Sequence, residues 1–159
     1  MDNFLERLKS KIQTKKSYII DKNKDELNIK NLSKKINKDF PRQESKFNVI
    51  YSYSLKYGKF LYPGGKNKIL YIGQSKGEKY NGKKDLGFRF KHCNGGNDNK
   101  INVCLSNYYQ NGTILRLDIF SLKNEFESKT LEKQLRKEFL QEYKACPIAD
   151  GASYRKEKA

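Results

Sequence analysis

The sequence lacks the features of a membrane-embedded, secreted or disulfide-rich protein. No stretch approaches the roughly 20 consecutive apolar residues that a membrane-spanning helix needs. The N-terminus has no apolar segment typical of a secretory signal peptide. The three cysteines of the chain, Cys93, Cys104 and Cys146, are scattered and show no paired CxxC spacing. This pattern favours reduced thiols and argues against a zinc site shared with His92, so we expect a cytoplasmic protein.

Acidic residues are scarce compared with basic ones. The chain of 159 residues has 34 lysines and arginines against 18 aspartates and glutamates, which gives a formal net charge of +16 at pH 7. Such a charge favours a polyanionic partner, because basic side chains that meet phosphates release condensed counterions. A membrane surface is the weaker alternative, since no long basic amphipathic helix with a bulky apolar face is present. The composition therefore predicts nucleic-acid binding, and the length suits one hydrophobic core.

Residues 1–46 are predicted to form a helical N-terminal extension. Apolar residues recur there at helical spacing, first from Phe4 to Ile12 and again from Leu32 to Phe40. The segment holds 13 basic against 7 acidic residues. It is therefore either a packing extension or an accessory DNA-binding arm.

Residues 47–151 are predicted to form one α+β domain, followed by a charged tail at 152–159. β-branched and aromatic residues indicate strands at 47–55 and 69–73, which should pair as a long-looped antiparallel hairpin. Further elements are expected in the order helix 86–93, helix 100–110, strand 113–122 and helix 128–144. The expected fold is a small three-stranded antiparallel sheet flanked by helices, in the order ββααβα.

Two tripeptides on the predicted hairpin give the strongest indication of function. Val49-Ile50-Tyr51 and Tyr71-Ile72-Gly73 resemble the paired motifs of the GIY-YIG nucleases. Arg89 on the first predicted helix, the segment around Glu132 on the last one, and Pro147-Ile148-Ala149-Asp150 resemble that family's later motifs. The resemblance covers roughly residues 47–151 and implies the GIY-YIG fold.

The sequence departs from the family pattern at several positions. Val49 replaces the first glycine, and Asp150 stands where asparagine is usual. The YIG tyrosine and Arg89 are 18 residues apart, longer than the minimal pattern. Family members often carry histidine or tyrosine four residues after the arginine; that position is Cys93 here, and His92 lies one residue earlier.

The resemblance implies hydrolysis of phosphodiester bonds, which requires an activated water and stabilised phosphate charge. Glu132 would hold Mg²⁺ or Mn²⁺, because magnesium accepts a single protein carboxylate together with waters and phosphate oxygens. Arg89 would neutralise the phosphate through its planar guanidinium. Tyr51 would orient the phosphate or the water. Tyr71 would act as general base or proton relay, a role for which His92 is the alternative.

The loop before Arg89 is a candidate DNA contact. Lys76, Lys79, Lys83 and Lys84 lie in this glycine-bearing insertion. Lys76, like the metal, could also supply the cation that a tyrosine base needs, since a free tyrosine has a pKa of about 10.

The leading interpretation is a divalent-metal-dependent endonuclease acting on double-stranded DNA, with a homodimer on the DNA to cut both strands. The compact architecture favours a restriction-type role over a homing endonuclease by analogy only. The alternatives are a catalytically inert nucleic-acid-binding module of the same fold and a basic RNA- or ribosome-associated protein.

Overall fold

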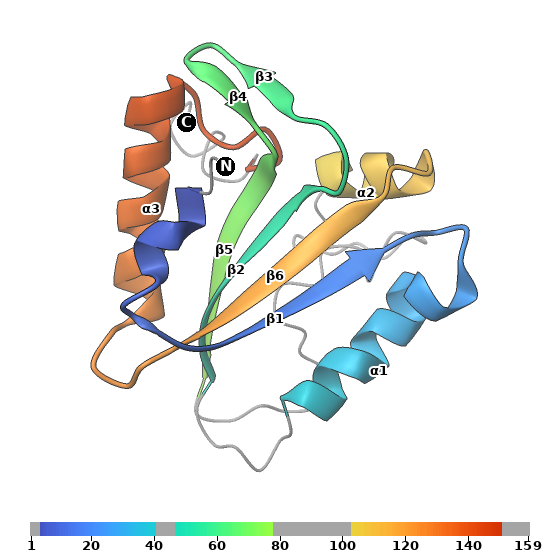
Figure 1. The fold of residues 1–159 in the computed structure, drawn as a ribbon, viewed down its shortest axis with the longest axis horizontal. Helices are drawn as coiled ribbons and strands as arrows, with labels where there is room; N and C mark the ends of the chain where they lie inside the picture. The colour runs from blue at the N-terminus through green and yellow to red at the C-terminus, as the bar shows by residue number, and fades with distance from the viewer. Residues whose placement is uncertain (1–3, 41–46, 78–102, 151–159) are drawn as a thin grey trace.

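A four-stranded antiparallel sheet with strand order β1-β6-β2-β5 forms the centre of the computed structural model (Figure 1). The structure describes residues 4–40, 47–77 and 103–150. Its strands are β1 (Ile12–Ile20), β2 (Phe47–Leu55), β3 (Phe60–Tyr62), β4 (Gly65–Asn67), β5 (Ile69–Gly77) and β6 (Leu115–Leu122). Its helices are α1 (Ile29–Asp39), α2 (Val103–Gln110) and α3 (Ser128–Tyr143), together with the 3₁₀ turns η1 (Phe4–Leu8) and η2 (Asp25–Leu27). No helix in these ranges is both long and apolar enough to cross a bilayer.

The prediction of an α+β fold with an antiparallel sheet is confirmed, but the three-stranded sheet is wrong. The fourth strand, β1, comes from the N-terminal extension that was predicted to be helical. It pairs with β6 along its length, from Ile12 opposite Leu122 to Ile20 opposite Leu115. The helical spacing of Phe4, Leu5 and Leu8 ends with η1. Pairing with β6 decides the conformation of the next residues, because tertiary contacts override weak local preferences.

The second half of the N-terminal extension is helical, as expected. Asn28 caps α1 by accepting a hydrogen bond from the backbone N–H of Asn31 at 3.0 Å. Leu32 and Ile36 are buried against the sheet. Residues 12–39 therefore share a sheet and a core with the strands that follow residue 47.

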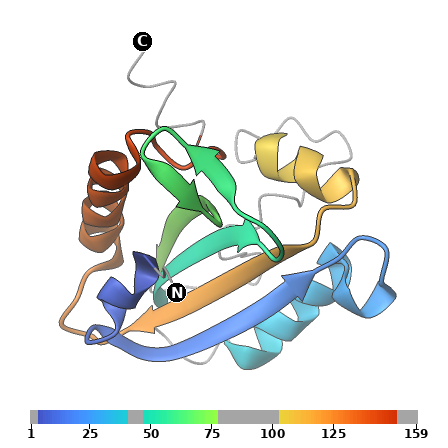
Figure 2. The same ribbon diagram turned by 45° about the horizontal axis from the view of Figure 1, so that its top comes forward.

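The predicted antiparallel hairpin is confirmed as β2 and β5. Tyr51 lies opposite Gly73 and Tyr53 opposite Tyr71, and an irregularity follows Tyr53. The long connection contains the small β3–β4 hairpin, which contacts the C-terminal end of α3 (Figure 2). There the backbone N–H of Gly64 donates to the carbonyl of Tyr143 at 2.9 Å.

Two hydrophobic clusters divide the faces of the sheet. One joins residues of α1 and α2 to Tyr51, Tyr53 and Tyr71. The other joins α3 and η1 to Ile50, Ile72 and other strand residues. Ile50 and Tyr51, which are neighbours on β2, thus point to opposite clusters, as the pleat requires.

The elements in the C-terminal half match their predictions closely. α2, β6 and α3 fall within the segments 100–110, 113–122 and 128–144. The helix predicted at 86–93 lies outside the described residues.

Candidate active site

Two tyrosines of the paired tripeptides stack against each other. The ring centroids of Tyr51 and Tyr71 are 5.9 Å apart, with an interplanar angle of 26°. Tyr53 meets the Tyr51 ring edge-on at 6.0 Å. Tyr51 is fully buried, whereas Tyr71 keeps 7% of its surface exposed. The antiparallel pairing of β2 and β5 therefore brings the two predicted site tyrosines together, although they are 20 residues apart in sequence.

Gly73 makes this stack possible. A Cβ atom at position 73 would lie 2.4 Å from Cζ and 2.5 Å from Oη of Tyr51, and 2.8 Å from Cε1 of Tyr71. All three separations are shorter than van der Waals contact between such atoms. The last residue of the Tyr-Ile-Gly tripeptide must therefore be a glycine, because the Tyr51 ring fills the space that a Cβ atom would need.

Glu132 lies on α3 beside an arginine that connects the site. Oε1 of Glu132 is 3.6 Å from Nη1 of Arg136, one helical turn further along. The Arg136 guanidinium also lies 5.9 Å from the centroid of the Tyr71 ring and 3.2 Å from Oδ1 of Asp150. One side chain therefore contacts Tyr71 of the second tripeptide, Glu132 on its own helix, and Asp150 of the segment 147–150.

The outer edge of β5 explains why these segments meet. β5 is an edge strand of the sheet, so its outward carbonyls need partners from elsewhere. Arg136 donates to the carbonyl of Ile72 at 2.9 Å through Nη2 and at 3.3 Å through Nε. The backbone N–H of Ala149 donates to the carbonyl of Leu70 at 2.8 Å. The segment 147–150 is therefore attached to the same strand as Tyr71.

Asp150 is a buried carboxylate with a cationic neighbour. Its side chain is 1% exposed, compared with 16% for Glu132 and 22% for Arg136. A buried carboxylate is costly unless a positive charge compensates it. The contact with Arg136 gives a physical reason why an aspartate is tolerated at this buried position.

Five residues of the predicted site lie outside the described residues: Arg89, His92, Lys79, Lys83 and Lys84. The backbone of Lys76 belongs to β5, opposite Asn48. From the predicted set, the structure stacks Tyr51 on Tyr71 and links Glu132 to Tyr71 through Arg136.

Sequence reasoning missed Arg136. The only available signal was its spacing, since it follows Glu132 by four residues and the two must share a side of the helix. That spacing is common on helix surfaces. The contacts with Ile72 and Asp150 depend on how α3 packs against β5, which no local pattern reveals.

A divalent cation at this site would have few protein carboxylates to bind. No group of three or more His, Cys, Asp or Glu side chains gathers within the described ranges. Magnesium does not require such a cage, since one carboxylate with waters and phosphate oxygens suffices. Glu132 meets the exposure condition because its carboxylate is partly exposed, although a cation there would have to compete with the Arg136 guanidinium 3.6 Å away. Asp150 is less suitable, because it is buried beside the guanidinium.

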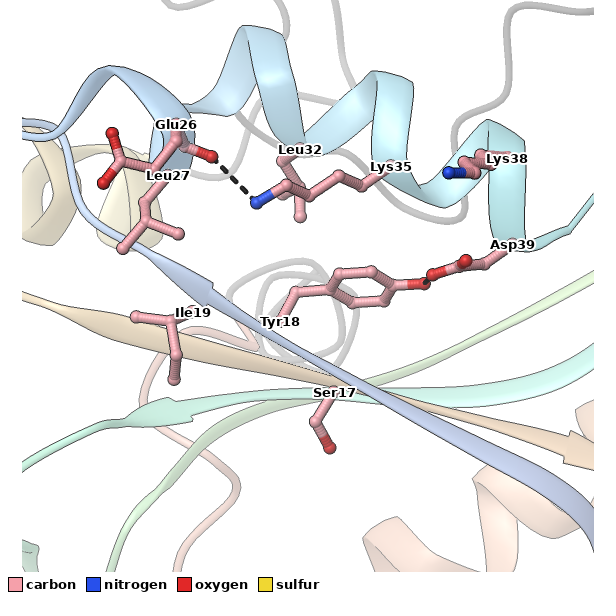
Figure 3. Close-up of a pocket in the computed structure, with 9 residues that line it drawn as sticks. All are labelled: Ser17, Tyr18, Ile19, Glu26, Leu27, Leu32, Lys35, Lys38 and Asp39. Carbon is pink, nitrogen blue, oxygen red and sulfur yellow. Dashed lines mark hydrogen bonds between the residues drawn. The ribbon is translucent and has the colours of Figure 1, made fainter.

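A separate cavity of about 380 Å³ lies between β1 and α1 (Figure 3). Tyr18 and Leu32 line it, with Lys35 and Lys38 along α1. None of its lining residues belongs to the predicted site, so the cavity does not identify the active centre. Elsewhere, burial raises the pKa of the Cys104 thiol.

Comparison of the chain with protein-family profiles, with curated proteins and with solved structures gave no match.

Proposed function

We propose that this protein is a divalent-metal-dependent endonuclease that hydrolyses phosphodiester bonds in double-stranded DNA. The observation that carries the proposal is that Arg136 links Tyr71, Glu132 and Asp150, while Tyr51 stacks on Tyr71. These four residues come from four separate parts of the chain, and each stands at a position that resembles a GIY-YIG motif. Packing alone does not require a glutamate–arginine pair beside two stacked tyrosines.

The charge of the chain supports a nucleic-acid substrate. Its net charge of +16 would attract a polyanion and accelerate encounter. A nuclease must also approach the phosphate backbone closely, which an acidic surface would oppose. The composition therefore agrees with the chemistry suggested by the tyrosines and Glu132.

Each site residue has a proposed task in the reaction. Tyr71, whose ring retains some exposure, would take up or relay the proton of the attacking water. Tyr51 would hold the Tyr71 ring in position through the stack. Arg136 would hold the Glu132 carboxylate at a fixed position relative to the Tyr71 ring, because it contacts both side chains. Arg89 would neutralise the scissile phosphate, and His92 is the alternative proton acceptor.

Glu132 would be the protein ligand of the metal. A bound Mg²⁺ or Mn²⁺ would supply charge neutralisation at the phosphate and a more acidic water. For Glu132 itself, the required task is to present a carboxylate near the phosphate while Arg136 limits its motion.

Plasmid cleavage tests the proposal directly. Supercoiled DNA incubated with the protein and Mg²⁺ should be converted to nicked or linear product, and chelation of the metal should stop the reaction. Glu132→Gln should abolish cleavage while leaving DNA binding nearly intact, because only the carboxylate charge is removed.

Glu138→Gln is the matched control for this experiment. Glu138 lies on the same helix, but it pairs with Arg7 at 2.7 Å on another side. The control variant should cut at the wild-type rate. Normal cleavage by Glu132→Gln, or loss of cleavage only in Glu138→Gln, would refute the assigned position of the glutamate.

A catalytically inert nucleic-acid-binding module is the second candidate function. Two observations favour it: Tyr51 is fully buried, and the Glu132 carboxylate faces a cation of the protein itself. This candidate predicts DNA binding without cleavage at any Mg²⁺ or Mn²⁺ concentration. The plasmid assay therefore separates the two functions.

A further inference from the structure

Three lysines form a continuous ridge along α3. Lys129, Lys133 and Lys137 follow one another at intervals of four residues, so they lie on one side of the helix about 6 Å apart along its axis. All three side chains are exposed. None of the three forms an ion pair or hydrogen bond with another described residue. We call these residues the α3 lysine ridge.

The α3 lysine ridge does not stabilise its own helix. Like charges spaced four residues apart destabilise a helix by roughly 0.2–0.5 kcal/mol per pair. Lys129 also lies in the first turn, where the helix dipole favours acidic side chains and no acidic residue is present. Local helix energetics therefore gives no reason for these three lysines.

The acidic residues of α3 could have neutralised the ridge but are engaged elsewhere. Glu138 and Glu142 pair with Arg7 of η1 at 2.7 and 2.5 Å. Glu132 faces Arg136. Arginines thus hold these three glutamates, and the lysines keep their positive charge toward solvent.

The ridge borders the candidate active site. Glu132 and Arg136 follow Lys129 and Lys133 by three residues, so on the helix surface the two rows are neighbours. By the same periodicity, Glu138 and Glu142, which pair with Arg7, lie on nearly the opposite side of the helix from the ridge. A strand of phosphates running along the ridge would therefore pass beside Glu132.

We infer that the α3 lysine ridge binds the phosphate backbone of duplex DNA and guides it to the site at Glu132 and Tyr71. The identity of this partner rests on the proposed function, whereas the ridge itself rests on three exposed lysines that pair with no other described residue. Three phosphate contacts along one helix would determine the register of the DNA and carry little sequence information.

The salt dependence of binding tests this inference. Binding of a short DNA duplex to the full chain should be measured across salt concentrations with a chelator present, so that no cleavage occurs. In the triple variant Lys129→Gln, Lys133→Gln, Lys137→Gln, the slope of log affinity against log salt should flatten by about two to three units. Glutamine retains good helix propensity, so thermal unfolding should show an intact fold.

The control is a second triple variant with the same change in charge. Lys24→Gln, Lys34→Gln and Lys38→Gln remove three exposed lysines of the N-terminal segment. This variant should change the slope by less than about one unit. Equal slopes in the two triple variants, or a larger change in the control, would overturn the inference and favour the N-terminal segment as the DNA-binding surface.

The outcome is independent of cleavage. A flattened slope in the ridge variant together with no plasmid cutting by wild type would support the ridge and reject the nuclease proposal. Normal cutting by wild type together with an unchanged slope in the ridge variant would support the nuclease proposal and reject the ridge.

Discussion

At the scale of single residues, the contact between Tyr51 and Gly73 explains part of the motif pattern. The two residues face each other across β2 and β5, and the tyrosine ring occupies the volume that a side chain at position 73 would need. A tyrosine in one tripeptide therefore requires a glycine in the other. The two motifs are linked by a steric condition as well as by any shared chemistry.

Gly73→Ala should destabilise the protein by about 1–3 kcal/mol, the usual cost of overpacking a filled core. The added methyl group would displace the Tyr51 ring, which is fully buried and has little space to move. Urea denaturation of Gly73→Ala in the wild-type background and in a Tyr51→Leu background measures the effect. The penalty should shrink in the second background, and an equal penalty in both would contradict the steric explanation.

At the scale of elements, the outer edge of β5 is the place where α3 and the closing segment meet. Arg136 and Ala149 supply donors to the carbonyls of Ile72 and Leu70. The same guanidinium compensates the buried carboxylate of Asp150. The stability of this edge therefore depends on one side chain.

Arg136→Gln should cost about 3–5 kcal/mol, because it leaves a buried carboxylate without its cationic partner. Asp150→Asn introduced into that variant should restore a large part of the loss, since an amide has no charge to compensate. Both are measured by urea denaturation at neutral pH.

Arg7→Gln is the matched control, because it removes two ion pairs that are largely exposed to solvent. That change should cost no more than about 1 kcal/mol. If Asp150→Asn gave no recovery in the Arg136→Gln background, the cost would have to come from the lost backbone contacts instead.

At the scale of the whole molecule, Tyr18 joins α1 to the sheet. Its hydroxyl donates to Oδ2 of Asp39 at 2.6 Å and thereby links β1 to the end of α1 (Figure 3). Burial, together with this hydrogen bond and the charge of Asp39, raises the pKa of Tyr18 well above its ordinary value. The folded state therefore keeps a proton that the unfolded chain loses at about pH 10.

Stability should consequently fall as the pH rises above about 10, because the unfolded state then binds fewer protons than the folded state. Below that pH, the contribution of Tyr18 is fully present. Tyr18→Phe should be less stable at neutral pH by about 0.5–1.5 kcal/mol, the value of one hydrogen bond, and should lose less stability in alkali. Urea midpoints between neutral and alkaline pH measure both effects.

Tyr57→Phe provides the comparison, since that ring is 71% exposed. It should leave both the neutral stability and the alkaline decline of the wild type in place. An alkaline decline of equal steepness in Tyr18→Phe and wild type would mean that other groups, such as the buried Tyr62 whose pKa is also raised, dominate it.

Much of the fold was predictable because the relevant patterns are local. The alternation of apolar residues in 47–55, the stripe on 128–144 and the spacing in 29–39 each depend on residues near one another in sequence. β2, α3 and the helical half of the N-terminal segment followed from them. β1 did not, because its central residues from Gln13 to Ser17 are exposed and carry no apolar alternation. Only the open edge of β6 makes that segment a strand.

The sequence by itself determined the α+β class, the β2–β5 hairpin and the prediction that Tyr51, Tyr71 and Glu132 act together. Only the tertiary structure decided that Tyr51 requires Gly73, that Arg136 connects Glu132 to Asp150, and that β1 completes the sheet. The physical reason is one of range. Side-chain periodicity is determined within a few residues, whereas the partner of a ring, a buried charge or a strand edge is chosen when distant segments pack.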